Sequence, residues 1–212
     1  MRSSALKPDS LPGDPFVIGV SCFLRTGPKL VLEVRKPGPW LQPAGKPPLI
    51  YLGCIGGSLE EGEAVIEALQ REAREEIGCG ITLHSARATV DISPGGVTVL
   101  EDCLIDDLRP AVIWETDPRD GYVPCAKVVV FVGETDGDPQ PGDLPAVVLA
   151  DPALISDIGT RTVTVAEATA GGAEFRQQID IPPDAELRLA STLKFAHRLV
   201  GTPHDLTRAS GG

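Results

Sequence analysis

Residues 57–79 read GSLEEGEAVIEALQREAREEIGC. Apolar residues recur in this stretch at the spacing of a helix, so we expect a helix over residues 63–77 that Gly78 ends. The stripe expected to pack on a sheet consists of Ile66, Leu69, Ala73 and Ile77. The strands around this helix should therefore supply the surface that covers the stripe.

Three glutamates of this helix, Glu72, Glu75 and Glu76, fall within a sector of about 100° beside the apolar stripe. Like charges three or four residues apart destabilise a helix by roughly 0.2–0.5 kcal/mol per pair. We expect Arg71 and Arg74 to offset only part of this repulsion. A solvated acidic face is one explanation for the cluster. A bound divalent cation is the other, because carboxylate oxygens suit Mg²⁺ and Mn²⁺.

The spacing of these residues resembles the Nudix box, the signature of the Nudix hydrolases. The seven fixed positions of that signature are matched by Gly57, Glu63, Arg71, Glu72, Glu75, Glu76 and Gly78. Seven fixed residues at set spacing make this a specific motif. The chain departs from the family at two packing positions, where Ala73 and Cys79 replace the usual bulky aliphatic residues.

The resemblance implies an enzyme that uses Mg²⁺ (or Mn²⁺) to cleave the diphosphate of a nucleoside diphosphate linked to another group. The implied metal ligands are the carbonyl of Gly56 and the carboxylates of Glu72, Glu75 and Glu76. Glu75 is implied either as a ligand or as the base that positions the water. Arg71 and Glu63 are implied as catalytic-site residues that orient the ligands.

Two residues resemble features of the ADP-ribose pyrophosphatase branch of the family. Arg35 ends the second expected strand, where that branch has an arginine that contacts phosphate; a solvated charge is the alternative. Pro94 lies in SPGG, where such enzymes often have a proline, although a plain turn explains that tetrapeptide equally well. The implied substrate is therefore ADP-ribose or a nucleotide sugar.

The chain departs from that branch in the strand before the box, which reads LIYLGCI and lacks the glutamate that members often carry. The branch often has its catalytic glutamate in a later loop. The acidic residues of the corresponding loop, residues 133–143, are Glu134, Asp136, Asp138 and Asp143. Any of them could be the base, or the loop could simply be solvated. Trp114 and Tyr122 could stack on adenine or could simply be packed.

Around the box, the hydrophobic pattern predicts an α+β fold, an αβα sandwich with a mixed central sheet flanked by helices. Strands are expected near residues 16–25, 30–35, 49–55, 81–92, 97–104, 127–133, 146–150 and 162–166. A second helix is expected over residues 184–201, with Asp184 as its N-cap and Gly201 after its end. Its expected buried stripe consists of Leu189, Leu193, Ala196 and Val200.

The length fits one domain, expected to span residues 16–204 between a flexible start, 1–15, and a flexible tail, 205–212. Residues 105–126 show no clear element, so we expect an insertion there. The five cysteines form no CxxC pair, which favours reduced thiols. No stretch has the pattern of a signal peptide or a membrane span, so we expect a cytoplasmic protein.

The formal net charge of −11 argues against nonspecific binding to nucleic acid or to an anionic membrane. The expected partner is a small-molecule nucleoside diphosphate substrate, and a homodimer is possible because many relatives dimerise. Hydrolysis of (oxidised) nucleoside triphosphates or of dinucleoside polyphosphates remains open. Two weaker alternatives are a nucleotide-binding Nudix module without activity and an isopentenyl-diphosphate isomerase.

Overall fold

A computed structural model describes residues 16–36, 45–93, 96–116 and 126–199. Its strands are β1 (Phe16–Thr26), β2 (Lys29–Val34), β3 (Leu49–Cys54), β4 (Ile81–His84), β5 (Thr89–Ser93), β6 (Gly96–Leu100), β7 (Val112–Glu115), β8 (Ala126–Thr135), β9 (Ala146–Ala150), β10 (Glu174–Gln177) and β11 (Glu186–Leu189). Its helices are α1 (Val65–Ile77), α2 (Ala153–Thr160), α3 (Val165–Ala170) and α4 (Ser191–Leu199). The strands form one mixed sheet whose main path runs β10-β9-β2-β1-β8-β7-β5-β6.

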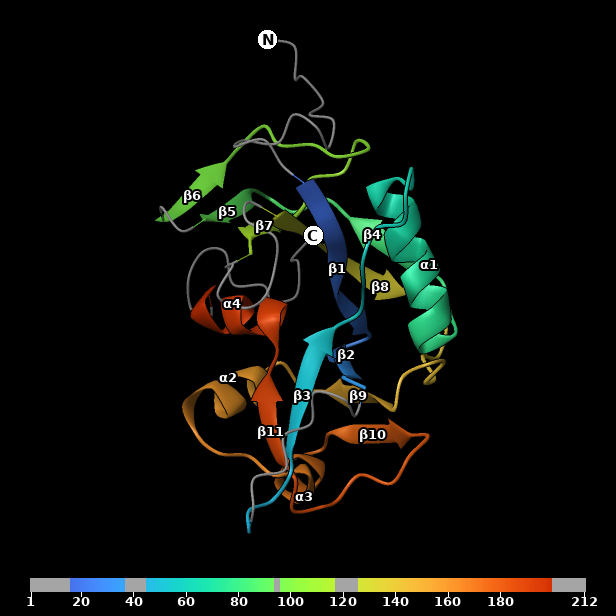
Figure 1. Cartoon of the computed structure of the whole chain (residues 1–212), viewed down its shortest axis with the longest axis vertical. Helices are drawn as coiled ribbons and strands as arrows, with labels where there is room; N and C mark the ends of the chain where they lie inside the picture. Colours follow the sequence, from blue (N-terminus) through green and yellow to red (C-terminus); the bar gives the residue numbers. More distant parts are fainter. Residues whose placement is uncertain (1–15, 37–44, 94–95, 117–125, 200–212) are drawn as a thin grey trace.

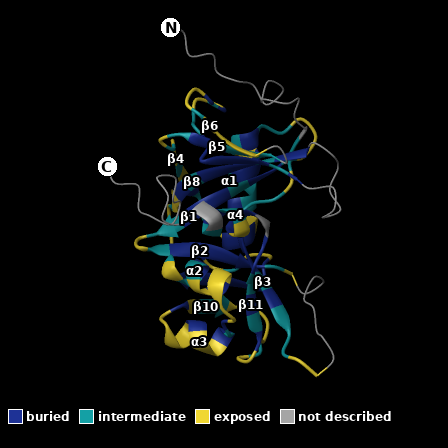
Figure 2. Cartoon of the chain, turned by 90° about the vertical axis from the view of Figure 1, so that its left-hand side faces the viewer, coloured by how far each residue is buried: buried dark blue, intermediate teal, exposed yellow. Residues whose placement is uncertain are grey.

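Helices cover both faces of this sheet (Figure 1). α1 packs on one face, over a core that includes Leu69 and Ile77. α2, α3 and α4 pack on the other face, over a core that includes Ile155 and Leu193. Figure 2 shows buried residues concentrated in the strands and exposed residues on the outer sides of α2 and α3. The expected α+β fold, an αβα sandwich, is confirmed.

Several expected strands match the structure to within two residues at each end, namely those at 16–25, 30–35, 49–55, 127–133 and 146–150. β1 and β2 form the expected hairpin, with Thr26 opposite Lys29. Gly27 lies in the turn at a φ of +56°, a conformation that a residue with a Cβ rarely adopts. This hairpin places β2 beside β3, which leads directly into the box.

Side chains of β2 alternate between the two cores. Leu32 and Val34 belong to the core beneath α2 and α4, whereas Val31 belongs to the core beneath α1. Because successive side chains of a strand point to opposite faces, Glu33 shares the α1 side with Val31. A charged side chain therefore lies on the face of the sheet that carries the glutamate-rich helix.

The helix α1 begins at Val65, two residues after the expected start, and Gly78 ends it in a left-handed conformation as expected. Its buried residues are Val65, Ala68, Leu69, Ala73, Glu76 and Ile77. Full burial of Leu69 contributes roughly 1.5–3 kcal/mol. Ile66, expected in the stripe, is only half-buried, so the stripe is rotated slightly from its expected position. This rotation brings Glu76 into the buried face.

The strand expected over 81–92 is in fact two strands, β4 and β5, separated by residues 85–88. β4 pairs with β8 and β5 pairs with β7, so the chain must break to move between them. The strand expected over 97–104 ends at Leu100, where the polar pair Glu101 and Asp102 forms a bend.

The strand expected at 162–166 is wrong, because α3 begins there at Val165. Thr164 caps this helix: its hydroxyl accepts from the N–H of Glu167 at 3.2 Å, and the Glu167 carboxylate accepts from the N–H of Thr164 at 2.8 Å. The alternation of β-branched residues in TVTVA suggested a strand. The capping box formed by Thr164 and Glu167 instead favours the start of a helix.

The helix expected over 184–201 is shorter than predicted, because residues 186–189 form β11 instead. There Leu187 and Leu189 are buried, in alternation with polar residues, and β11 pairs in parallel with β3. Asp184 precedes that strand and is not a helix N-cap. On α4, Leu193 and Ala196 are buried as expected. The remaining predicted residues, Val200 and Gly201, lie outside the described residues.

Three elements were not predicted: β7 within the 105–126 insertion, α2, and β10. They are short and lack a long periodic signal. The predicted flexible ends, 1–15 and 205–212, lie outside the described residues, as does part of the insertion, 117–125. None of the helices in the described part of the chain is long and apolar enough to cross a membrane.

Candidate active site

Gly56 follows β3 and brings the backbone against the carboxylate of Glu76. Its N–H donates a hydrogen bond to Glu76 Oε2 at 2.9 Å. Its φ is +140°, and a Cβ at this position would lie 2.2 Å from the carbonyl oxygen of Val20. Only glycine therefore fits here.

The carbonyl of Gly56 is available to a ligand. The neighbouring carbonyls of Ile55 and Gly57 accept hydrogen bonds from β1, from the N–H groups of Cys22 at 2.8 Å and Val20 at 2.9 Å. Among the described residues, no N–H group is bonded to the Gly56 carbonyl between them. A backbone oxygen with this freedom fits the ligand role that the resemblance implied for Gly56.

Gly57 allows the Glu72 carboxylate to approach the backbone. A Cβ at Gly57 would lie 2.2 Å from Glu72 Oε1, and the Glu72 side chain is only 14% exposed. The two glycines after β3 thus bring Glu72 and Glu76 of α1 against one short backbone segment.

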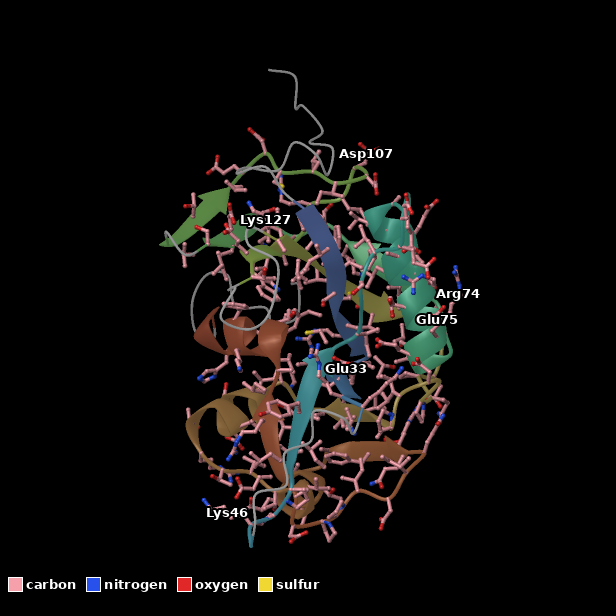
Figure 3. The ribbon with its side chains drawn as sticks, in the orientation of Figure 1. Glu33, Lys46, Arg74, Glu75, Asp107 and Lys127 are labelled. Atoms are coloured by element: carbon pink, nitrogen blue, oxygen red, sulfur yellow. The ribbon has the colours of Figure 1, made fainter. Side chains whose placement is uncertain are left out.

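Arg71 holds the glutamates on the outer side of this site. It makes a two-pronged contact with Glu63, at 2.9 and 3.0 Å, and bonds Glu72 at 2.9 Å and Glu75 at 3.3 Å. The hydrogen bond from Arg71 holds the pKa of Glu63 below its usual range, and Glu63 raises the pKa of Arg71. Glu75 is the i,i+4 partner of Arg71. One guanidinium shared by Glu63, Glu72 and Glu75 offsets only part of the negative charge, as expected. Arg74, in contrast, is exposed and points away from the sheet (Figure 3).

Glu76 is the buried member of the cluster, with a relative exposure of 8%. Its pKa is raised from 4.5 to about 9, chiefly by burial and also by the nearby charges of Glu33, Glu72 and Asp143, although the Gly56 N–H lowers it. A carboxylate kept in this environment needs a proton or a cation to balance it. Glu75, by comparison, is exposed.

Glu33 on β2 belongs to the same cluster, although it lies outside the box and was not among the predicted site residues. It lies opposite Gly53 of β3, and a Cβ at Gly53 would be 2.1 Å from Glu33 Oε1. Glu33 is 7% exposed, and burial raises its pKa. The charge of Glu72 raises this pKa further, whereas the ion pair with Arg35, at 3.2 Å, lowers it. Figure 3 shows Glu33 at the centre of the sheet, on the side of α1.

A signal for Glu33 was present in the sequence. It is the only charged residue within the strand LVLEV, and alternation assigns it to a packed face. The strand LIYLGCI has no glutamate of its own, but Glu33 of the neighbouring strand lies opposite its glycine, Gly53.

Arg35, the predicted phosphate-binding residue, lies next to this carboxylate. Its N–H donates to the carbonyl of Tyr51 at 2.9 Å, and its guanidinium bonds Glu33. The adjacent Lys36 pairs with Asp143 at 2.7 Å. The hydrogen bond to Asp143 raises the pKa of Lys36, and the charges of Glu76 and Glu72 raise it too. Two cations therefore border the carboxylates.

The loop of residues 133–143 reaches the site through its last residues. The N–H groups of Gln140, Gly142 and Asp143 donate to the final carbonyls of α1, at 2.8–3.0 Å. A Cβ at Gly142 would lie 1.9 Å from the carbonyl oxygen of Glu75, so glycine permits this contact. These bonds fix Asp143 at the C-terminal end of α1, beside Glu76.

A family model described as a NUDIX domain matches residues 15–179 of the chain. The chain belongs to the NUDIX family. Membership confirms the resemblance found in the box and the prediction of a hydrolase of this family.

Solved structures similar to this NUDIX protein include a MutT NUDIX hydrolase from Burkholderia pseudomallei, with 20% identity over 88% of this chain and 98% of that chain and a TM-score of 0.39. DR0079 from Deinococcus radiodurans is 18% identical, over 89% of this chain and 86% of that chain, with a TM-score of 0.39. An ADP-ribose pyrophosphatase from Streptococcus suis is 12% identical, over 64% and 73%, with a TM-score of 0.38. Comparison with curated protein sequences finds no match.

The NUDIX domain does not bring every predicted candidate to the box. Of the possible bases in the loop, Glu134 lies opposite Arg25 of β1, Asp136 bonds Thr82 at 2.7 Å, and Asp138 pairs with Arg176. All three of these contacts lie away from Gly56 and Glu76, whereas Asp143 lies beside them.

Two aromatic candidates and Pro94 cannot be placed at the site. Trp114 is 4% exposed and packs against Phe195 with ring centroids 5.1 Å apart, so it is a core residue and the stacking role proposed for it is wrong. Tyr122 and Pro94 lie outside the described residues.

The donor set of the NUDIX site fits a hard divalent cation. Glu72, Glu76 and the free Gly56 carbonyl are all oxygen donors, the type that Mg²⁺ prefers. In the described part of the chain, no group of three acidic, histidine or cysteine side chains is already arranged to hold an ion. Glu72 is balanced by the charge of Arg71, and Glu76 accepts a hydrogen bond from the Gly56 N–H. A bound cation would take over the balancing of both carboxylates.

Proposed function

We propose that this NUDIX protein hydrolyses the diphosphate of a nucleoside diphosphate linked to a second group, with ADP-ribose as the leading substrate. The single observation that carries the proposal is the buried Glu76 held against Gly56, beside Glu72 and Glu33. That much negative charge beside a free carbonyl supports a cation site. The cation would in turn attract an anionic substrate to an acidic protein.

Glu72, Glu76 and the Gly56 carbonyl would hold the divalent cation, with Mg²⁺ or Mn²⁺ as the expected ion. When bound, the ion would neutralise the diphosphate and lower the pKa of a coordinated water. Arg71 would fix the direction of Glu72, because it bonds both Glu72 and Glu63. This role needs no direct contact between Arg71 and the substrate.

The base that takes the proton from water is proposed to be Glu75, which is exposed at the outer side of the cluster. Asp143 is the second candidate, because the loop fixes it beside Glu76. Arg35 and Lys36 would receive the phosphate oxygens, since their cations border the carboxylates. Water adds to one phosphorus, and the bridging oxygen leaves with the other phosphate.

We predict that ADP-ribose incubated with the protein and Mg²⁺ will yield AMP and ribose 5-phosphate in equal amounts, and that excess EDTA will stop the reaction. Chromatography of the products measures both. Release of inorganic pyrophosphate from a nucleoside triphosphate instead would assign the other hydrolase class. Absence of turnover with ADP-ribose, nucleotide sugars, nucleoside triphosphates and dinucleoside polyphosphates alike would reject the proposed function.

A further inference from the structure

Among the described residues, three pairs of a glutamate and an arginine two residues apart form ion pairs along a strand of the sheet. These pairs are Glu33 and Arg35 on β2 and at its end, Glu174 and Arg176 on β10, and Glu186 and Arg188 on β11. Residues two apart on a strand point to the same face, which allows the members of each pair to meet. The pair on β2 differs from the others in its burial and in its place beside the box.

In the pair on β2, the anion is buried and the cation is the more exposed partner. Glu33 is 7% exposed, whereas the side chain of Arg35 is 42% exposed. The order is reversed on β10, where Glu174 is exposed and Arg176 is partly buried. A buried carboxylate needs a counter-charge, and Arg35 is the ion-pair partner that Glu33 has in the described part of the chain. Glu33 therefore holds the arginine from its buried side.

The residue opposite Glu33 provides the space for this buried carboxylate. A Cβ at Gly53 would lie 2.1 Å from Glu33 Oε1, the same oxygen that accepts the hydrogen bond from Arg35 Nε at 3.2 Å. Arg35 is held at a second point, because its backbone N–H donates to the Tyr51 carbonyl at 2.9 Å. Both ends of the arginine are thus fixed on the sheet, its backbone by β3 and its Nε by Glu33.

The bond to Glu33 uses the Nε of Arg35 and not its terminal nitrogens. A guanidinium is planar and carries its five N–H donors in a rigid fork. Fixing Nε therefore fixes the plane of the group and the direction in which the terminal nitrogens donate. A phosphate is bound best by two such donors together, so this direction matters for a phosphorylated substrate.

The register of β2 and β3 places Arg35 at the border of the cation site. Glu33 lies opposite Gly53, three residues before Gly56, and Arg35 lies one pair further from Gly56, opposite Tyr51. Two residues of a strand span about 6.7 Å. Glu33 thus stands between Arg35 and the carboxylates of the box, and the arginine borders the cation site without entering it.

We infer that Glu33 is a positioning residue for substrate binding, which anchors Arg35 through Nε so that its terminal nitrogens meet the phosphate beside the bound cation. Glu33 itself contacts neither the substrate nor the cation. The inference rests on the proposed function, because it adds a residue to the same site. It differs from the alternative that Glu33 is a further cation ligand, since an anchor acts only through Arg35.

A double-mutant cycle on Glu33 and Arg35, with ADP-ribose and saturating Mg²⁺, tests this role. Glu33→Met should raise KM at least about tenfold and change kcat less than about threefold, because it disorders a binding group and leaves the box intact. Arg35→Met should raise KM at least as much. The variant with both changes should be no worse than Arg35→Met alone, because Glu33 then has nothing to position. Glu33→Gln should recover most of the affinity, since its amide oxygen can still accept from Nε.

Glu174→Met is the matched control, because it removes the glutamate of a pair of the same kind, in which Arg176 Nε donates at 2.7 Å on the far strand β10. Its KM should equal that of the wild-type protein. Urea unfolding checks that every variant folds. Glu33→Met should fold, because it replaces a buried charge by an apolar chain and leaves Arg35 exposed enough for water to hydrate it.

Binding of α,β-methylene ADP-ribose, measured by calorimetry with Mg²⁺, repeats the cycle without turnover. Effects that multiply in the double variant, or a folded Glu33→Met with an unchanged KM, would overturn the inference. So would a Glu33→Met variant with weaker Mn²⁺ binding and a lower kcat at an unchanged KM, which would make Glu33 a cation ligand.

These measurements separate the inference from the proposed function. If the wild-type protein cleaves ADP-ribose and the cycle is additive, the function stands and the positioning role is wrong. If it binds the analogue with the expected cycle but cleaves no substrate, the positioning role stands and the function is wrong. A wild-type protein that neither binds the analogue nor cleaves ADP-ribose would overturn the inference together with ADP-ribose as the substrate.

Discussion

Replacing Glu76 by glutamine is expected to lower kcat by roughly 100-fold or more on the best substrate, because the amide is a much poorer ligand for a divalent cation. The fold should survive, since the glutamine carbonyl can still accept the hydrogen bond from the Gly56 N–H. Steady-state rates at saturating Mg²⁺ measure the effect. Calorimetric titration with Mn²⁺ should show a parallel loss of cation affinity.

Glu61→Gln is the matched control, because it makes the same change of charge at an exposed position before α1. Its rate and its cation affinity should stay close to those of the wild-type protein. If Glu76→Gln keeps more than about a third of the wild-type rate, Glu76 is not a ligand of a catalytic ion.

The free energy of unfolding of the metal-free protein is expected to fall as the pH rises from about 5 to 9. Burial and the neighbouring carboxylates raise the pKa of Glu76 from 4.5 to about 9, so across this range the folded protein keeps a proton that the unfolded chain releases. The folded state then binds more protons than the unfolded state, and stability decreases with pH by up to about 1.4 kcal/mol per unit. Glu63, whose pKa is lowered by Arg71, acts below pH 4.5. Glu33, whose pKa is raised by burial, changes stability in the same direction as Glu76.

Urea unfolding in EDTA at several pH values measures this dependence. Glu76→Gln should make the profile less steep and raise stability at pH 8, because the buried charge of Glu76 no longer has to form, whereas the contribution of Glu33 remains. Saturating Mg²⁺ should also flatten it, since the cation replaces the proton on the ionised carboxylate. A wild-type profile that is already flat between pH 5 and 9 would show that Glu76 ionises freely in the folded state.

The sequence allowed prediction of the parts of the fold that depend on local periodicity. The helix over 63–77 and the strand over 146–150 have strong, uniform patterns, and both are found within two residues of their expected bounds. For elements whose pattern is short or mixed, the predicted type or bounds were wrong. ELRL has the alternation of a strand, but it adjoins a helical stripe, so the two were merged into one helix.

The same distinction applies to the site. The box residues lie close together in sequence, so their spacing on one helix placed Glu72, Glu75 and Glu76 correctly on one side. Glu33 and Asp143 come from a neighbouring strand and a distant loop, and only pairing of β2 with β3 and the bonds to the end of α1 bring them there. Such contacts depend on long-range register, which a local pattern cannot supply.

Crystals grown with Mn²⁺ and a non-cleavable analogue of ADP-ribose provide the most direct test of the cation site, because manganese can be located by its anomalous scattering. The account predicts an anomalous peak within ligand distance, about 2.2 Å, of carboxylate oxygens from Glu72 and Glu76 and of the Gly56 carbonyl, with the diphosphate of the analogue on its other side. An analogue bound in the crystal with no anomalous peak between these residues would contradict it.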